Sequence, residues 1–329
     1  MGSIVPVHIV AGFLGVGKTT SILNLMKKLE GKEHVAVIVN ERGEVGLDGI
    51  VMQSADNKLE IREVTGGCIC CTAGPLFVQA LLEILEKVRP DRIFMEPSGI
   101  SKPGEILDLI HSLDISSRLD IRPIVTLVDP ALFLKPQIME LPLFRNQVDA
   151  ADIIVANRCD LASETVTEAF YEKAKKLYPP KIAVLSTRFG QLPEEILSLI
   201  VDPNKINTNL AGSEAKFEMA FSHSTGTGHP MYNERGWTWY PSTIFAHNEL
   251  TDIFEALRSG TAGIKGKVER SKGIFHTENG WYLIEQALGE VYEREIQYRR
   301  DNRCQIIFSG SDREDVDRVS HLLESCVKD

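Results

Sequence analysis

Residues 12–19 have the types and spacing needed to bind phosphate groups, and they read GFLGVGKT. The run matches G-x-x-x-x-G-K-[ST] and stands between an apolar run and an amphipathic helical pattern, the context that this motif requires. Glycines let backbone N–H groups point inward around phosphates, and the following helix adds partial positive charge. We expect the Lys18 amine to reach the β- and γ-phosphates and the Thr19 hydroxyl to bind Mg²⁺. The predicted phosphate-binding residues are Gly12, Gly15, Val16, Gly17, Lys18, Thr19 and Thr20.

A carboxylate, Glu96, ends the apolar run that starts at Arg92, and Pro97-Ser98-Gly99 follows it. An acid at the end of a strand beside a phosphate cradle is placed to hold Mg²⁺, usually through water. The N–H group of Gly99 is placed to donate to a γ-phosphate. The alternative is a surface turn with an incidental acid, since Pro-Ser-Gly is also a good turn sequence. The predicted catalytic group is Lys18, Thr19 and Glu96.

The sequence NRCD at positions 157–160 ends a later apolar run and is similar to the guanine-specific pattern N-K-x-D. The Asp160 carboxylate can accept hydrogen bonds from both N1–H and the exocyclic amine of guanine, and Asn157 can bond the base edge and pin the loop. Arg158 stands where Lys is usual; it can stack on the base plane but is not equivalent to Lys. Ser186 and Thr187 follow the next run, where a loop can present an N–H group to the guanine O6. An ordinary Asn/Asp turn is the alternative.

Three cysteines crowd into the sequence GGCICC at positions 66–71. In an extended segment Cys68 and Cys70 project to one side and Cys71 to the other. Two thiolates clamp Zn²⁺ or a similar metal but fill only half of a tetrahedral shell, so the predicted site is open and exchangeable. Acids in the nearby run 40–48 are candidates to complete it. A redox pair and buried apolar cysteines are the alternatives.

Short apolar runs alternate with helical patterns through the first two thirds of the chain. This alternation predicts an α/β fold: a mainly parallel sheet with helices on both faces and ligands at the carboxyl ends of the strands. The predicted strands are Val5–Val10, Val35–Asn40, Arg92–Glu96, Ile124–Val128, Ile153–Asn157 and Ile182–Ser186, and the predicted helices cover Ile22–Leu29, Leu76–Val88 and Thr165–Leu177.

The pattern changes near Pro203. We expect a P-loop domain over residues 1–202, a polar, turn-rich linker over 203–216 and a smaller α+β domain over 217–329. Successive strands in this last part indicate an antiparallel sheet with helices on one face. The predicted strands are Phe217–Phe221, Trp237–Phe245, Ile264–Ser271, Trp281–Gln286 and Cys304–Phe308, with helices over Leu250–Arg258 and Asp312–Cys326. Trp237, Trp239 and Trp281 fit its core better than a docking surface.

The composition limits the possible partners and the compartment. The 329 residues include 36 Lys+Arg and 46 Asp+Glu, a formal charge of −10, which argues against binding to nucleic acid or to an anionic membrane surface. No apolar run approaches the roughly 20 residues that span a bilayer. Six cysteines are too few for a disulfide scaffold in a chain of this length. We therefore expect a cytoplasmic protein.

Together these motifs resemble the CobW-like metallochaperone GTPases, relatives of the GTPases that insert nickel into hydrogenase and urease. Four motifs stand in the family order, at residues 12–20, 67–71, 96–99 and 157–160, and the segment 270–273 is similar to the family's carboxy-terminal domain. The resemblance implies GTP hydrolysis coupled to delivery of zinc, cobalt or another metal. No arginine finger is evident in the sequence, so we expect slow turnover, on the order of minutes per cycle. The resemblance also implies Mg²⁺–GTP at Lys18, Thr19 and Glu96, the transition metal at Cys68, Cys70, Cys71 and Glu44, and guanine at Asp160.

Several readings compete with a metallochaperone. One is a GTPase that activates or gates a cofactor-dependent enzyme, such as a corrinoid protein, without itself carrying metal. Others are a passive metal buffer with a vestigial nucleotide site and a small-molecule kinase. The expected partner is a client metalloprotein or cofactor enzyme that docks on the carboxy-terminal domain; a homodimer is left open.

Overall fold

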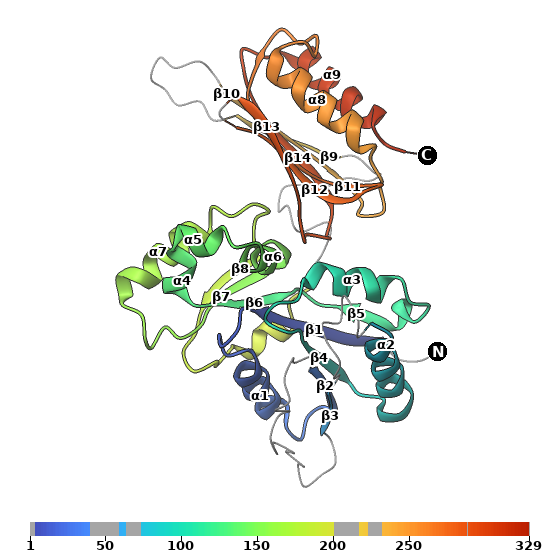
Figure 1. Cartoon of the computed structure of the whole chain (residues 1–329), viewed down its shortest axis with the longest axis vertical. Coiled ribbons are helices and arrows are strands. Elements are labelled where there is room, and N and C mark those ends of the chain that lie inside the picture. Colours follow the sequence, from blue (N-terminus) through green and yellow to red (C-terminus); the bar gives the residue numbers. More distant parts are fainter. Residues whose placement is uncertain are drawn as a thin grey trace. The chain divides into compact units, whose positions relative to one another are not determined.

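The computed structural model describes residues 4–39, 59–63, 74–200, 217–222, 232–287 and 289–328. The chain divides into two compact units, Met1–Val201 and Asp202–Asp329, each of which has its own sheet (Figure 1). The predicted linker 203–216 lies outside the described residues.

The amino-terminal unit is built on a parallel sheet with the strand order β3-β2-β4-β1-β6-β7-β8, and β5 pairs in parallel with β1. Val, Ile and Ala dominate its central strands, which are buried on both faces as a sheet covered by helices requires. The strands are β1 (Val5–Gly12), β2 (Val35–Val39), β3 (Leu59–Glu63), β4 (Arg92–Glu96), β5 (Leu119–Ile121), β6 (Val125–Val128), β7 (Ile153–Ala156) and β8 (Ala183–Ser186).

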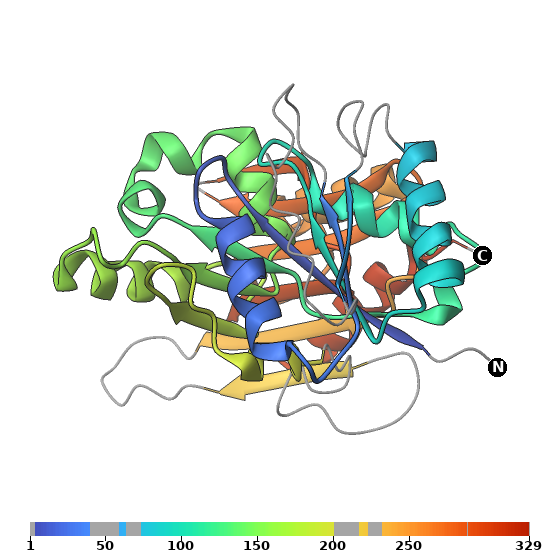
Figure 2. The same ribbon diagram turned by 90° about the horizontal axis from the view of Figure 1, so that it is seen from below.

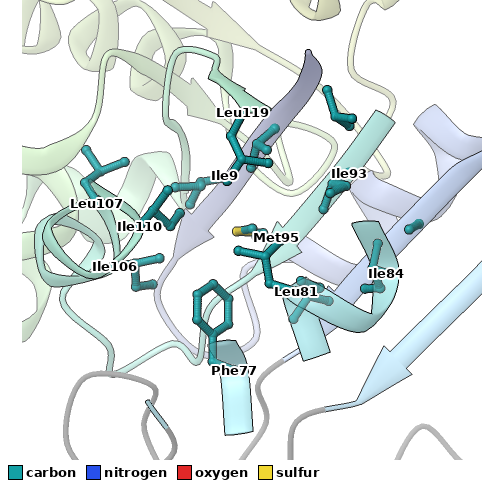
Figure 3. Packing of buried hydrophobic residues seen from close by; sticks show 14 of the residues in the cluster. Ile9, Phe77, Leu81, Ile84, Ile93, Met95, Ile106, Leu107, Ile110 and Leu119 are labelled. Atoms are coloured by element: carbon teal, nitrogen blue, oxygen red, sulfur yellow. The ribbon is translucent and has the colours of Figure 1, made fainter. Parts of the chain in front are cut away.

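Helices cover both faces of this sheet. In Figures 1 and 2, α1 and α2 flank the β1–β4 region from opposite sides. Figure 3 shows the core on the α2–α3 face, where Phe77, Leu81, Ile106 and Ile110 pack around Ile9 of β1. The helices are α1 (Lys18–Leu29), α2 (Gly74–Glu83, continued by a π-helical turn over Ile84–Val88), α3 (Pro103–His111), α4 (Pro130–Leu134), α5 (Pro136–Met139), α6 (Pro142–Ala150) and α7 (Glu164–Ala174), with 3₁₀ turns over Ser116–Arg118 and Glu194–Leu197.

The carboxy-terminal unit is an antiparallel sheet with the order β13-β12-β11-β14-β10-β9. Its helices α8 and α9 lie on one face (Figure 1), where Trp237 and Trp239 enter the core. The indole N–H of Trp237 donates to Ser320 Oγ at 2.7 Å, so this tryptophan fastens the sheet to α9. The elements are β9 (Phe217–Ser222), β10 (Tyr232–Trp239), α8 (His247–Ser259), β11 (Lys267–Thr277), β12 (Gly280–Ala287), β13 (Glu290–Glu295), β14 (Asn302–Ser309) and α9 (Arg313–Ser325).

The predicted α/β class with a second, antiparallel unit is confirmed, while some strand boundaries were wrong. The strand expected over Trp237–Phe245 ends at Trp239, because Pro241 has no N–H group to continue the ladder. Phe245 forms only isolated bridges. The strand expected over Ile264–Ser271 is β11, which runs on to Thr277.

Candidate nucleotide site

Glycine shapes the turn that joins β1 to α1. Gly12 and Gly17 have φ angles of 144° and 95°, which only glycine adopts readily. A Cβ atom on Gly12 would lie 2.5 Å from the carbonyl oxygen of Leu127, and one on Gly17 would lie 2.6 Å from Asn157 Nδ2. The backbone of the predicted phosphate cradle is therefore packed against β6 and the loop after β7, with no room for a side chain at either position.

The predicted catalytic group converges at the start of α1. Lys18 is the first residue of this helix; its side chain is buried and its amine donates to the carbonyl oxygen of Phe13 at 3.4 Å. The hydroxyl of Thr19 donates to Oε1 of Glu96 at 2.8 Å. Glu96 ends β4 and is also buried. The parallel pairing of β1 with β4 brings these residues together from distant parts of the chain.

The segment after Glu96 lies directly on the cradle. A Cβ atom on Gly99 would be 2.7 Å from the backbone nitrogen of Leu14. Both N–H and Oγ–H of Ser101 donate to the carbonyl oxygen of Ser98, at 2.9 and 2.7 Å, and close a turn over 98–101. The Ser98–Ser101 turn therefore lies against the phosphate cradle at Leu14.

Sequence reasoning did not single out Gln147, which connects these two segments. Its Oε1 accepts a hydrogen bond from the N–H of Gly12 at 3.0 Å, and its Nε2 donates to the carbonyl oxygen of Ser101 at 2.5 Å. The side chain is 1% exposed. The sequence offers one signal for this residue, a glutamine on the buried face of a helix. That signal predicts a buried hydrogen bond but does not identify the partner.

Asn157 connects the cradle to the loop after β8. Its Nδ2 donates to the carbonyl oxygen of Val16 at 2.8 Å, and its Oδ1 accepts from the N–H of Gly190 at 3.1 Å. The side chain is buried. It therefore binds backbone groups of two loops, and the predicted contact with the base edge stays a prediction.

The other residues predicted to bind the base lie at adjacent loop ends. The N–H of Cys159 donates to the Thr187 carbonyl at 3.2 Å, and the N–H of Thr187 donates to the Ala156 carbonyl at 2.7 Å, so the loops after β7 and β8 run side by side. Asp160 is exposed beside them. Ser186 accepts a hydrogen bond from the hydroxyl of Tyr171 at 3.0 Å.

Arg158 has an unusual backbone conformation for a residue with a side chain. Its φ angle is 64°, and its exposed guanidinium lies 3.7 Å from Oδ2 of Asp129. The other oxygen of Asp129 caps α4 by accepting from the N–H groups of Ala131 and Leu132. Asp129, which sequence reasoning did not identify, thus draws the Arg158 side chain toward the end of β6.

The predicted transition-metal ligands Cys68, Cys70, Cys71 and Glu44 lie outside the described residues. Within the described ranges, no cluster of three or more His, Cys, Asp or Glu side chains is suited to a metal ion. The thiols of Cys159, Cys304 and Cys326 are free and buried, and burial raises the pKa of each, to about 12 for Cys326. None of these three thiols belongs to a cluster of candidate metal ligands in the described residues. In the described residues, no helix is long and apolar enough to span a bilayer.

A parallel sheet, a glycine-rich β1–α1 turn and a threonine bonded to an acid at the end of β4 together define a P-loop nucleotide-binding domain. The sequence of residues 6–185 matches the family described as "CobW/HypB/UreG, nucleotide-binding domain". The chain belongs to this family, as its motifs predicted.

Relatives with assigned names align with most of this chain. It is 30% identical over 316 residues to the zinc chaperone YeiR of Escherichia coli, covering 92% of this chain and 93% of the relative. It is 27% identical over 326 residues to zinc-regulated GTPase metalloprotein activator 1 of Schizosaccharomyces pombe, covering 88% and 76%. The crystal structure of Zn(II)-bound YjiA GTPase from E. coli aligns with all of both chains at 18% identity and a TM-score of 0.47.

Proposed function

We propose that this chain is a GTP-hydrolysing metallochaperone that hands zinc to a client metalloprotein. The observation that carries the nucleotide half of the proposal is the hydrogen bond between Thr19 and Glu96 on the phosphate cradle. The metal half is supported by the relatives that are named as zinc chaperones and as a zinc-regulated GTPase metalloprotein activator. Cobalt, which the sequence also allows, is the alternative cargo.

The residues beside the cradle fit a magnesium ion. A hydroxyl and a carboxylate are hard oxygen donors, which Mg²⁺ prefers, and both belong to rigid elements, α1 and β4. When bound there, Mg²⁺ neutralises charge on the β- and γ-phosphates. Lys18 binds the same phosphates, and backbone N–H groups of residues 15–20 enclose them.

The loops after β7 and β8 form the base site in this proposal. The Asp160 carboxylate is exposed and free to accept both donors of guanine, while Arg158 covers the base plane from a position set by Asp129. Asn157 holds the base loop and the cradle together, so that base and phosphates are bound in one fixed register.

Zinc is the cargo, held by Cys68 and Cys70 with help from Cys71 and Glu44. The γ-phosphate of GTP meets the Ser98–Ser101 turn, which is already closed by its own hydrogen bonds, and GTP orders the run 40–48; the thiol segment precedes α2 in the same part of the chain. Loss of the γ-phosphate relaxes these segments and lowers zinc affinity, which releases the metal to a client docked on the 217–329 domain. By linkage, zinc tightens GTP binding by the factor with which GTP tightens zinc binding. The low cysteine content supports a reducing compartment, the cytoplasm in this proposal, as the place of exchange.

The test is a zinc titration of the wild type with a non-hydrolysable GTP analogue and with GDP. We expect tighter zinc binding with the analogue; equal affinities would exclude the switch. In Cys68→Ser/Cys70→Ser the tight site should be lost, while Cys304→Ala, which alters a buried thiol in the other unit, should retain it. The wild type should hydrolyse GTP, and Lys18→Ala should abolish this activity. That result would exclude the hypothesis of a passive metal buffer. If the double variant still bound its client in a nucleotide-dependent way, a GTPase that gates a cofactor enzyme would be favoured.

A further inference from the structure

Gln147 joins the start of the phosphate cradle to the turn that is expected to meet the γ-phosphate. Its one amide group accepts from Gly12 N–H and donates to the Ser101 carbonyl. Ser101 is 1% exposed, and Gly12 is buried against the carbonyl group of Leu127, so water cannot easily replace either bond. A buried backbone group that loses its hydrogen-bond partner is destabilised by the full desolvation penalty. The two bonds of Gln147 therefore favour the one position of the turn in which both are made.

The helix that carries Gln147 is anchored independently of the bridge. Thr126 Oγ1 donates to the backbone carbonyl of Gln147 at 3.1 Å. Lys181 Nζ donates to the carbonyls of Val148 and Ala151 at 2.7 and 2.8 Å, which holds the carboxyl end of α6. At the other end, the ring of Phe144 packs edge-on against Phe13 of the cradle, with centroids 6.2 Å apart. The amide therefore extends from a fixed support.

The turn itself is stiff. Two hydrogen bonds from Ser101 close it onto Ser98, and Gly99 lies so near Leu14 that an added Cβ atom would be 2.7 Å from the Leu14 nitrogen. Any shift of Gly99 toward or away from the cradle moves the Ser101 carbonyl with it. Such a shift must either break the bond from Gln147 Nε2 or be resisted by it.

We infer that Gln147 is a positioning residue that holds the Ser98–Ser101 turn against the cradle and so sets how strongly the site distinguishes GTP from GDP. This inference rests on the proposed function only in that the site binds guanine nucleotides. Holding the turn in advance removes the cost of ordering it when a γ-phosphate arrives. GDP has no γ-phosphate to meet the turn, so its affinity should gain nothing from the bond to Ser101.

The test compares GDP with a non-hydrolysable GTP analogue, without zinc, in variants that separate the two bonds. Gln147→Glu keeps an acceptor for Gly12 N–H but loses the donor to Ser101. We expect the ratio of analogue affinity to GDP affinity to fall about fivefold, the value of one hydrogen bond. The added charge repels the analogue more than GDP, so the ratio is measured at low and at high salt: a fall caused by repulsion shrinks at high salt, whereas a fall caused by the lost hydrogen bond persists. Thr126→Val removes a buried hydrogen bond to the same helix but leaves the bridge, and should change the ratio less than twofold.

A wild-type measurement covers the case in which Gln147→Glu does not fold. Exchange of the α6 amides should slow on addition of the analogue relative to GDP, together with those of residues 98–101. If amide exchange slowed at residues 98–101 but not in α6, or if a folded Gln147→Glu protein kept the wild-type affinity ratio, the inferred role of Gln147 would be wrong. Neither result would contradict the proposed function. A wild type that binds neither nucleotide would overturn the proposed function and this inference together, and thermal unfolding would distinguish that result from a misfolded sample.

Discussion

Thr19 donates its hydroxyl hydrogen to Oε1 of Glu96 across 2.8 Å, although 77 residues separate them in the chain. The two belong to α1 and to the end of β4, which are fixed relative to each other by the pairing of β4 with β1. In the proposed magnesium site, this hydroxyl and this carboxylate would supply two of the six oxygen positions of an octahedral shell. Little reorganisation is then needed to bind Mg²⁺ with the nucleotide.

Replacing Glu96 by Gln should raise the Mg²⁺ concentration needed for half-maximal GTP hydrolysis by about tenfold or more. The amide can still accept from Thr19, but it has lost the charge that attracts the cation, and charge-assisted contacts are roughly twice as strong as neutral ones. Glu33→Gln is the matched control, because Glu33 pairs with Arg92 at the opposite end of the same strand. That variant should lower stability slightly and leave the Mg²⁺ dependence unchanged; a parallel shift in both variants would contradict the prediction.

Replacing Asp160 by Asn should convert a preference for GTP into one for xanthosine triphosphate. The carboxylate accepts from two donors of guanine, whereas an amide offers one acceptor and one donor, which match N1–H and the C2 carbonyl of xanthine. Hydrogen bonds to charged groups contribute about 1.5–3 kcal/mol, so GDP affinity should fall at least tenfold. Competition of each nucleotide against labelled GDP measures the change. Glu164→Gln, at the start of the neighbouring α7, should leave selectivity intact, and an Asp160→Asn protein with unchanged GDP affinity would remove Asp160 from the base site.

The phosphate cradle and the central strands could be predicted because their signals are local. A glycine pattern and a run of β-branched residues each occupy a few consecutive positions. Helices α3 to α6 were not predicted from the sequence, because each spans only four to nine residues and begins with Pro. Proline usually indicates the end of a helix, but it is also well tolerated at the first helical position. Strand β13 was not predicted either, because it is a polar strand at the edge of its sheet, with the sequence EVYERE and no alternation of apolar residues.

The hydrogen bonds that connect the loops of the site could not be predicted from the sequence, because the two partners of each bond are far apart in the chain. Gln147 bonds Gly12 across 135 positions, and Asn157 bonds Val16 across 141. No spacing rule covers such pairs, since they exist only after α6 has packed near β1 and β7 has joined the sheet next to β6, the neighbour of β1. Asn157 was named from its motif, whereas Gln147 has no motif of its own.

The free energy of unfolding should fall as pH drops below about 6.5, in part because of His8. Burial, with Arg92 and Arg122 nearby, lowers the pKa of His8 to about 3. Between these values the unfolded chain binds a proton at His8 that the folded chain does not, so stability is greatest above pH 6.5 and decreases toward pH 3. The slope is about 1.4 kcal/mol per pH unit, or roughly 2 kcal/mol between pH 7 and 5.

Urea unfolding at pH 7 and pH 5 tests this dependence. His8→Gln keeps an acceptor for Arg92 but cannot titrate, so its stability should change less with pH than that of the wild type. His34→Gln, which alters a half-exposed histidine ahead of β2, should retain the wild-type dependence. A pH profile of His8→Gln identical to that of the wild type would show that His8 is not the group responsible.

Gly99→Ala should lower GTP turnover about tenfold while changing GDP affinity less than twofold. The new Cβ atom would lie 2.7 Å from Leu14 N and 2.8 Å from Leu14 Cδ2, and the backbone of the cradle cannot yield cheaply. Overpacking of this kind costs about 1–3 kcal/mol, and the strain is relieved when the Ser98–Ser101 turn moves off the cradle. Gly236→Ala is the control, because its Cβ atom would meet only the Cys304 carbonyl at 3.6 Å. Single-turnover hydrolysis and GDP titration measure the two quantities. If Gly99→Ala hydrolysed GTP at the wild-type rate, contact between this turn and the cradle would not be needed for hydrolysis.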